Sequence, residues 1–206
     1  SDFDFIHHIG KGAFARVFLV KLKADASRPF ALKVLAKSFV AKKKQNEHTL
    51  SERSILVRSA EAGCPFSGRL QYAFQTPKRL YLVSDYYAGG SLFYHLRRNR
   101  NKPLPLDAVR FYAAELASAL LSLHRMDIVY RSVKLEDVIL DQRGHIRLVD
   151  FGLAKEHVTR PEQCTTFCGT AEYIAPELLR GMKYGKPVDW WGYGILVFEL
   201  LVGKTP

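Results

Sequence analysis

The sequence contains little cysteine, only three residues in 206. Their odd number and irregular spacing argue against a disulfide framework and favour a reducing compartment. Cys164 and Cys168 lie four residues apart, but no histidine accompanies them closely. Two reduced thiols are therefore a better interpretation than part of a metal site. We expect an intracellular protein, cytoplasmic or nuclear.

Long hydrophobic runs are also missing. The longest, residues 190–202, is shorter than a membrane span and contains Glu199. No basic-then-apolar leader opens the sequence, so we expect no secretory signal. The sequence predicts no transmembrane segment.

Acidic residues are scarce: 20 Asp and Glu against 31 Lys and Arg give a net charge of +11. Such an excess could indicate nucleic acid or an anionic membrane as partner. The basic residues are scattered, however, with short groups only at 42–44 and 97–100. No long basic block adjoins an aromatic stacking platform. A solvated surface with some phosphate-binding sites is the better interpretation, and no specific nucleic-acid partner is expected.

Strand patterns dominate the first part of the chain. Short apolar or alternating runs between Gly- and Pro-marked turns predict strands at 5–10, 16–22, 30–35, 70–74 and 79–84. One helix is predicted over 46–60, with Leu50, Ile55 and Leu56 facing the core. Residues 85–90 then connect to the second part.

Helical patterns dominate the second part. Pro103 and Pro105 precede Asp107, a predicted N-cap. The following helix places apolar residues on one face at Val109, Tyr112, Ala113, Leu116, Leu120 and Leu123. A second helix over 187–201 is apolar on nearly all sides, which predicts central burial.

Five motifs occur in an order typical of protein kinases. They are the glycine-rich segment 10–17, Ala31-Leu32-Lys33, the loop 130–137, Asp150-Phe151-Gly152 and Ala175-Pro176-Glu177. With residues 48–52 and 166–170, they resemble the AGC group of serine/threonine kinases. The resemblance implies an α+β, two-lobe protein-kinase fold: a small five-stranded lobe with one main helix (1–84), a hinge (85–90) and a larger helical lobe (91–206). We expect this larger lobe to be incomplete at its C-terminus.

The resemblance implies a site for ATP and Mg²⁺. Glycines at 10 and 12 would admit phosphates to the backbone, and Glu52 would aim Lys33 at them. Singly, Lys33 is better interpreted as a snorkelling strand lysine and Glu52 as a solvated helix residue. In this motif order the functional interpretation is favoured. The expected ATP-binding residues are Gly10, Gly12, Val17, Ala31, Lys33, Glu52, Ser84, Asp85, Ser91 and Ile139, and the expected metal ligands are Asp137 and Asp150.

The catalytic loop departs from the family pattern. Ser132 occupies the position of the aspartate base, and Asp137 that of a metal-binding asparagine. A neutral hydroxyl cannot take up a proton near pH 7 as a carboxylate can. Lys134 and Thr170 keep their expected catalytic roles. The sequence leaves open a serine/threonine kinase with attenuated transfer, a pseudokinase that docks a partner, and, a distant third, a basic binding protein that needs no nucleotide.

The resemblance also implies regulation by phosphorylation. Thr166 is the expected site for an upstream kinase, with Arg131, Lys155 and His48 binding its phosphate. Leu56, Leu70, Tyr130 and Phe151 are expected to stack between the lobes, with Asp189 anchoring their base.

A protein substrate is expected to bind through acidic residues. Glu136 and Glu199 match positions that bind arginines upstream of the phosphoacceptor. Ser91 and Ala171 replace the family's usual Glu and Pro, which weakens the expected preference for basic peptides. The alternative partner is a docking protein.

Overall fold

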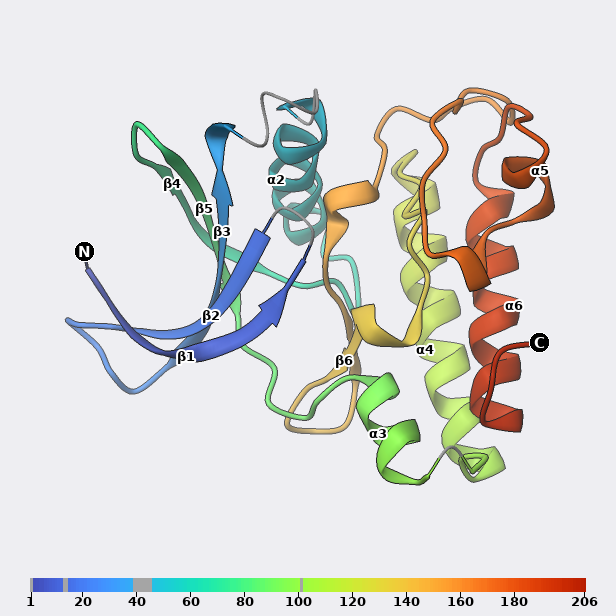
Figure 1. The fold of residues 1–206 in the computed structure, drawn as a ribbon, viewed down its shortest axis with the longest axis horizontal. Helices are drawn as coiled ribbons and strands as arrows, with labels where there is room; N and C mark the ends of the chain where they lie inside the picture. The colour runs from blue at the N-terminus through green and yellow to red at the C-terminus, as the bar shows by residue number, and fades with distance from the viewer. Residues whose placement is uncertain (1, 13–14, 39–45, 101) are drawn as a thin grey trace.

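The computed structural model describes residues 2–12, 15–38, 46–100 and 102–206, and the side chains of 46–49 lie outside this description. A five-stranded antiparallel sheet with strand order β1-β2-β3-β5-β4 forms the first part (Figure 1). Its strands are β1 (Phe3–Lys11), β2 (Ala15–Leu22), β3 (Pro29–Ala36), β4 (Leu70–Gln75) and β5 (Arg79–Asp85). The five predicted strands are therefore confirmed.

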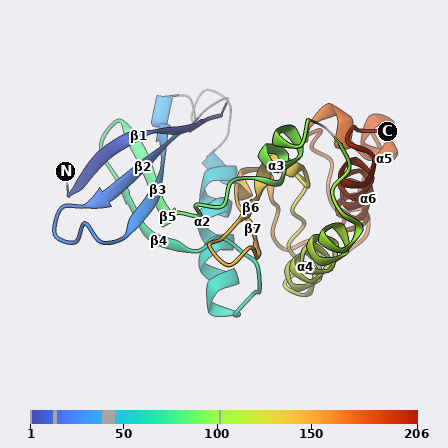
Figure 2. The same ribbon diagram turned by 90° about the horizontal axis from the view of Figure 1, so that it is seen from below.

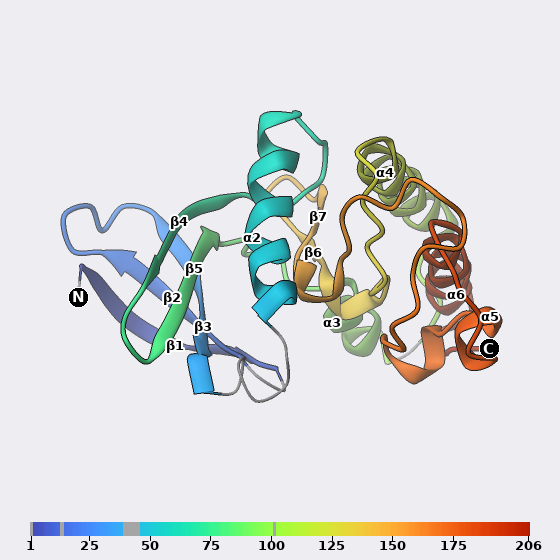
Figure 3. The same cartoon turned by 90° about the horizontal axis from the view of Figure 1, so that it is seen from above.

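Helix α2 (Asn46–Glu61) lies between the sheet and the helical part (Figure 3). Ile55 and Leu56 are buried, as predicted, but Leu50 is 69% exposed, so its predicted inward orientation is wrong. The reason is helical geometry: at about 100° per residue, position 50 lies more than 100° away from both 55 and 56.

The second part is mainly helical. Its helices α4 (Leu106–Arg125) and α6 (Pro187–Val202) run side by side (Figures 1 and 2). Buried leucines of both helices share one core cluster. The remaining elements are α3 (Leu92–Arg98), η1 (Leu135–Asp137), β6 (Val138–Leu140), β7 (Ile146–Leu148), η2 (Phe151–Leu153), η3 (Ala171–Tyr173) and α5 (Pro176–Leu179). Among the helices that the structure describes, none combines the length and apolarity needed to cross a membrane.

Two details of this part differ from the prediction. Helix α4 has Pro105 at its N-cap position, without a side-chain cap, and Asp107 lies within the first turn. The α4 N-cap prediction is therefore wrong, because the helix begins one residue before Asp107. Helix α6 is only partly central: Leu196 and Leu200 are buried, whereas Trp191 and Phe198 are 46% and 40% exposed.

The two parts are joined through a continuous apolar core. Leu56, Tyr130 and Phe151 are buried in one cluster, and Leu70 packs against it. The rings of Tyr130 and Phe151 meet edge to face, with centroids 5.3 Å apart. This stack is as predicted, and it fixes α2 and the sheet relative to the loops that carry the candidate site.

Candidate active site

Three charged side chains from separate elements meet between the two parts of the structure. Nζ of Lys33 on β3 lies 2.6 Å from Oε1 of Glu52 on α2 and 2.8 Å from Oδ1 of Asp150, just before η2. Burial alone would lower the pKa of Lys33, but the two carboxylates outweigh it and raise this pKa overall. Lys33 in turn lowers the pKa of Asp150. The lysine therefore stays positively charged, as phosphate binding requires.

Gly152 leaves room at one point of this cluster. A β-carbon at Gly152 would lie 3.1 Å from Oδ1 of Asp150 and 3.5 Å from Nζ of Lys33. The first distance is tighter than an ordinary contact. The absence of a side chain at 152 therefore helps Asp150 reach Lys33.

The glycines at 10 and 12 have a different explanation. A β-carbon at Gly10 would lie 3.5 Å from Cβ of Val17, and one at Gly12 would lie 3.7 Å from the carbonyl oxygen of Ala15. Both are ordinary van der Waals distances, so packing does not require glycine at either position. Close approach of phosphate oxygens to the backbone would require it. Packing among the described residues therefore does not explain these two glycines.

Asp137 and Asp150, the predicted magnesium ligands, influence each other. Asp137 is buried, and its pKa is raised to about 7, first by burial and then by the charge of Asp150. A bound divalent cation would relieve this repulsion. Within the described ranges, no group of three or more His, Cys, Asp and Glu residues forms a metal cluster. Magnesium commonly combines one or two carboxylates with substrate phosphates, so this pair of ligands fits a phosphate-bound ion.

The two departures in the catalytic loop are in direct contact. Oγ of Ser132 donates a hydrogen bond of 2.9 Å to Oδ2 of Asp137, and Nζ of Lys134 lies 3.6 Å from the same oxygen. Ser132 and Asp137 are only 8% and 6% exposed. A carboxylate at 132 would instead repel that of Asp137. A serine at 132 is thus compatible with an aspartate at 137, a relation that the sequence alone did not suggest.

The buried carboxylate of Asp189 on α6 holds the start of this loop. It accepts hydrogen bonds from the backbone N–H groups of Tyr130 at 2.8 Å and Arg131 at 2.7 Å, and Nε2 of His124 lies 2.7 Å away. Arg131 has a φ of 64°, which is unfavourable for a residue other than glycine. Asp189 helps to hold that backbone. The contact of His124 with Asp189 was not predicted. A histidine in the last turn of a helix gives only weak evidence of such a partner.

The residues expected around adenine come from both parts. Register places Val17 of β2 opposite Lys33, and Ala31 of β3 opposite Ser84 of β5. Ile139 is carried by β6 in the other part. All three apolar residues are half-buried.

Two further residues expected at the nucleotide use their side chains internally. Oδ1 of Asp85 accepts hydrogen bonds from Arg28 at 2.5 Å and Gln71 at 2.8 Å. Oγ of Ser91 caps α3 by accepting from the backbone N–H of Tyr94 at 3.1 Å. The side chains of Asp85 and Ser91 are therefore engaged within the protein.

Of the residues predicted to bind a phosphate on Thr166, Arg131 and Lys155 make other hydrogen bonds. Thr166 is exposed, and its carbonyl accepts a 2.6 Å hydrogen bond from the hydroxyl of Tyr184. Arg131 also donates to this hydroxyl, at 3.1 Å, while Lys155 contacts a backbone carbonyl of its own segment at 3.4 Å. The side chain of His48 lies outside the described residues. Tyr184, which was not predicted, is thus the link between Arg131 and the Thr166 loop.

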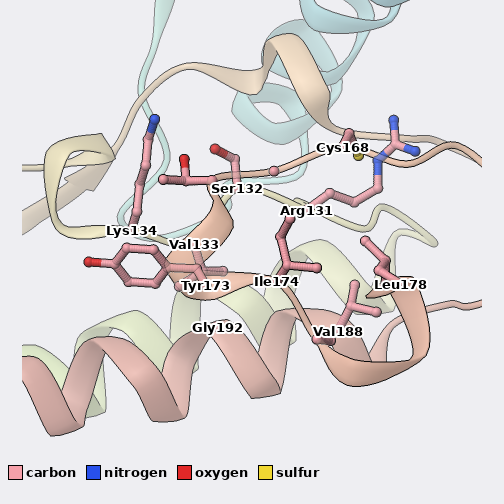
Figure 4. Close-up of a pocket in the computed structure, with 13 residues that line it drawn as sticks. Arg131, Ser132, Val133, Lys134, Cys168, Tyr173, Ile174, Leu178, Val188 and Gly192 are labelled. Atoms are coloured by element: carbon pink, nitrogen blue, oxygen red, sulfur yellow. The ribbon is translucent and has the colours of Figure 1, made fainter. Parts of the chain in front are cut away.

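A small pocket of about 20 Å³, room for roughly one water molecule, lies between the catalytic loop, residues 168–175 and α6 (Figure 4). Ser132, Lys134 and Thr170 line it together with apolar residues. In Figure 4, the side chains of Ser132 and Lys134 point away from Gly192 on α6. Their polar groups thus lie on the side of the loop opposite to that helix.

The two predicted substrate-binding acids differ in accessibility. Glu136 is exposed, but Glu199 on α6 is only 8% exposed. The hydroxyl of Tyr173 donates a hydrogen bond to Oε2 of Glu199, and burial raises the pKa of this glutamate. Tyr173 was not predicted, because nothing in the local sequence indicates a partner on α6. Glu199 is therefore already engaged.

A lysine–glutamate–aspartate cluster between a five-stranded sheet and a helical part is the arrangement that the resemblance to protein kinases predicted. The family described as the protein kinase domain matches residues 3–206, and the chain belongs to that family. The predicted α+β kinase fold is confirmed.

The relatives narrow the class. Over all 206 residues the chain is 48% identical to serine/threonine-protein kinase Sgk3 of Rattus norvegicus and to Sgk2 of Homo sapiens, and 46% identical to YPK1 of Saccharomyces cerevisiae. These are AGC-group kinases, so the predicted resemblance is confirmed. The chain spans 40%, 55% and 29% of their respective lengths.

Proposed function

We propose that the chain binds ATP with magnesium and transfers the γ-phosphate to serine or threonine in basic protein substrates, at an attenuated rate. The observation that carries this proposal is the contact of Lys33 with both Glu52 and Asp150. The backbone at Gly10 and Gly12 would receive the phosphates, and Lys33 would supply positive charge. Asp137 and Asp150 would hold magnesium, which neutralises phosphate charge when bound.

The attenuation follows from Ser132. Its hydroxyl donates to Asp137 and, being neutral, cannot take the proton of a substrate hydroxyl as an aspartate would. Phosphoryl transfer depends mainly on positioning and charge neutralisation, so the loss of the base reduces the rate without abolishing it. Thr170 and Lys134, which lie close to Ser132, would position the acceptor.

A pseudokinase is the second candidate. Two observations favour it: Ser132 is turned to Asp137, and Glu199 is engaged by Tyr173. In that case the chain would bind ATP and dock a partner protein, with its conformation controlled by an upstream kinase acting at the exposed Thr166.

One pair of measurements distinguishes the candidates. A fluorescent ATP analogue is titrated with and without magnesium, and transfer from radiolabelled ATP to an arginine-containing peptide is then followed, with Lys33→Met as the inactive control. Magnesium-dependent binding with slow transfer supports the attenuated kinase. Binding without transfer above the Lys33→Met background supports the pseudokinase, and absence of binding contradicts both.

A further inference from the structure

Residues 150–177, the activation segment of the kinase resemblance, contact α2 through Glu156. Oε1 of Glu156 accepts hydrogen bonds from NH1 of Arg58 at 2.6 Å and from Oγ of Ser54 at 3.0 Å. NH2 of Arg58 donates in turn to the carbonyl oxygen of Met126, just after α4, at 3.2 Å. One carboxylate and one guanidinium thus join α2 to the activation segment and to the helical part.

The geometry suits a device that sets the position of α2. Ser54 and Arg58 are four residues apart and therefore share a helix face. The side chain of Glu156 is only 10% exposed, which strengthens charge-assisted hydrogen bonds to it. Glu52, which contacts Lys33, lies half a turn before Ser54 on the same helix. A shift of α2 that broke the contacts of Glu156 would therefore also move Glu52.

Arg131 and Lys155, two of the three residues expected to bind a phosphate on Thr166, make other contacts. Arg131 donates to the Tyr184 hydroxyl, and Lys155 to a carbonyl of its own segment. Even so, Glu52 already contacts Lys33 at 2.6 Å. Among the side chains that the structure describes, Glu156 is the acid that ties the activation segment to α2.

We propose that Glu156, Arg58 and Ser54 form a clamp that positions α2, and so holds Glu52 against Lys33, without phosphate on Thr166. All three are positioning residues: they act on the nucleotide site through the helix. The inference rests on the proposed function in one respect, that Lys33 binds ATP.

The test uses the whole chain and two readouts, affinity for a fluorescent ATP analogue with magnesium and hydrogen exchange of the α2 amides. Glu156→Gln is expected to weaken nucleotide affinity by about three- to tenfold, within the range for loss of one typical intramolecular hydrogen bond. It should also accelerate exchange in α2. Glu162→Gln, an exposed acid on the same segment, is the matched control and should change neither readout.

Two further experiments test whether the clamp depends on the charges of Glu156 and Arg58 and whether it depends on phosphate on Thr166. The swap Glu156→Arg with Arg58→Glu should recover most of the affinity that either single variant loses. Phosphatase treatment, verified by mass spectrometry, should leave both readouts of the unaltered chain unchanged.

Wild-type behaviour of Glu156→Gln in both readouts overturns the clamp, as does a loss of α2 protection on phosphatase treatment. A swap that recovers nothing also counts against it. If the unaltered chain binds no nucleotide, the proposed function fails, and hydrogen exchange of α2 alone then decides the clamp.

Discussion

The hydroxyl of Ser132 donates a 2.9 Å hydrogen bond to Oδ2 of Asp137, which links the two positions where the catalytic loop departs from its family. The family pattern has a carboxylate at the first position and a neutral amide at the second. Here the neutral group comes first and the carboxylate second. The pair keeps one acidic group but moves it five residues along the loop, so a base at 132 is best restored by changing the two positions together.

The first prediction concerns this restoration. Ser132→Asp with Asp137→Asn is expected to raise the initial rate of peptide phosphorylation by about ten- to a thousandfold. This increase lies within or below the usual contribution of a positioned base. Ser132→Asp alone should gain less, because two neighbouring buried carboxylates repel and one stays protonated. Asp137→Asn alone is the control. A double variant that binds ATP normally but turns over no faster would show that the base is not the missing part.

The second prediction concerns stability against pH. The pKa of Asp137 rises from its ordinary value of 3.8 to about 7 in the folded chain, mainly through burial. The folded state therefore holds this proton more tightly than the unfolded state. Without metal or nucleotide, the free energy of unfolding should decrease as pH rises from about 4 to about 7. The decrease attributable to this group is at most about 4 kcal/mol.

Urea unfolding at a series of pH values checks this. Asp137→Asn should remove most of the decrease and be more stable than the unaltered chain at pH 8, whereas Asp107→Asn, at an exposed carboxylate, should keep it. Identical pH profiles for Asp137→Asn and the unaltered chain would contradict a raised pKa at this position.

Local patterns were sufficient to predict the framework. Apolar alternation between Gly and Pro turns predicted all five strands of the sheet, since it records which side of a strand is buried. The same reasoning failed where a shift of one residue or a rotation about the helix axis decides which way a side chain faces or which residue caps a helix. Leu50 lies on the outer side of α2, and Asp107 begins one residue too late to cap α4.

The residues that contact the site residues were harder to predict from the sequence. The Tyr173–Glu199 and Arg58–Glu156 contacts join residues 26 and 98 positions apart. Such contacts depend on how elements pack, and a single sequence carries no local record of them. Motif order did place Lys33, Glu52 and Asp150 together, because each belongs to a pattern with a known role. That these three residues bind ATP and magnesium remains a prediction, which the nucleotide titration tests.

The third prediction concerns substrate recognition. Tyr173→Phe removes the hydroxyl that donates to Glu199 and leaves that carboxylate without this bond. The KM for a peptide with an upstream arginine should then fall by about two- to fivefold, the range for a partly exposed ion pair. A peptide with alanine in place of the arginine should show no change. Tyr193→Phe, at a hydroxyl that donates to a backbone carbonyl of α4, is the control. Equal effects on both peptides would argue against Glu199 as an arginine-binding group.

The fourth prediction concerns association. Trp191, Phe198, Leu201 and Val202 on α6 are each at least 40% exposed. Exposed apolar surface on one helix favours self-association. The 206-residue chain should therefore form oligomers at micromolar concentration in light scattering, and Trp191→Glu with Phe198→Glu should reduce them. Leu50→Glu, at an exposed leucine on α2, should not. A monomer at all concentrations, with a single cooperative melting transition, would contradict this.

The fifth prediction concerns Ser84, an expected ATP-binding residue near the end of β5, and the space that its small side chain would leave beside adenine. Ser84 lies opposite Ala31 on β3 and Leu70 on β4, so its neighbours in the register are one small residue and one larger one. Leu70 packs against the core that joins the two parts, and Leu56 is buried in it, so neither is available to fill the space left by a serine. Each methylene buried there would contribute about 0.8 kcal/mol.

An ATP analogue with a benzyl group on the adenine amine should consequently bind at least as tightly as ATP in a competition titration. Ser84→Met should exclude the analogue and retain ATP, because a longer side chain would occupy the expected space without touching the phosphate site. Ser84→Ala, which keeps the space open, should bind both and serves as the matched control. If the unaltered chain and Ser84→Met reject the analogue equally while both bind ATP, another side chain already fills the space behind Ser84.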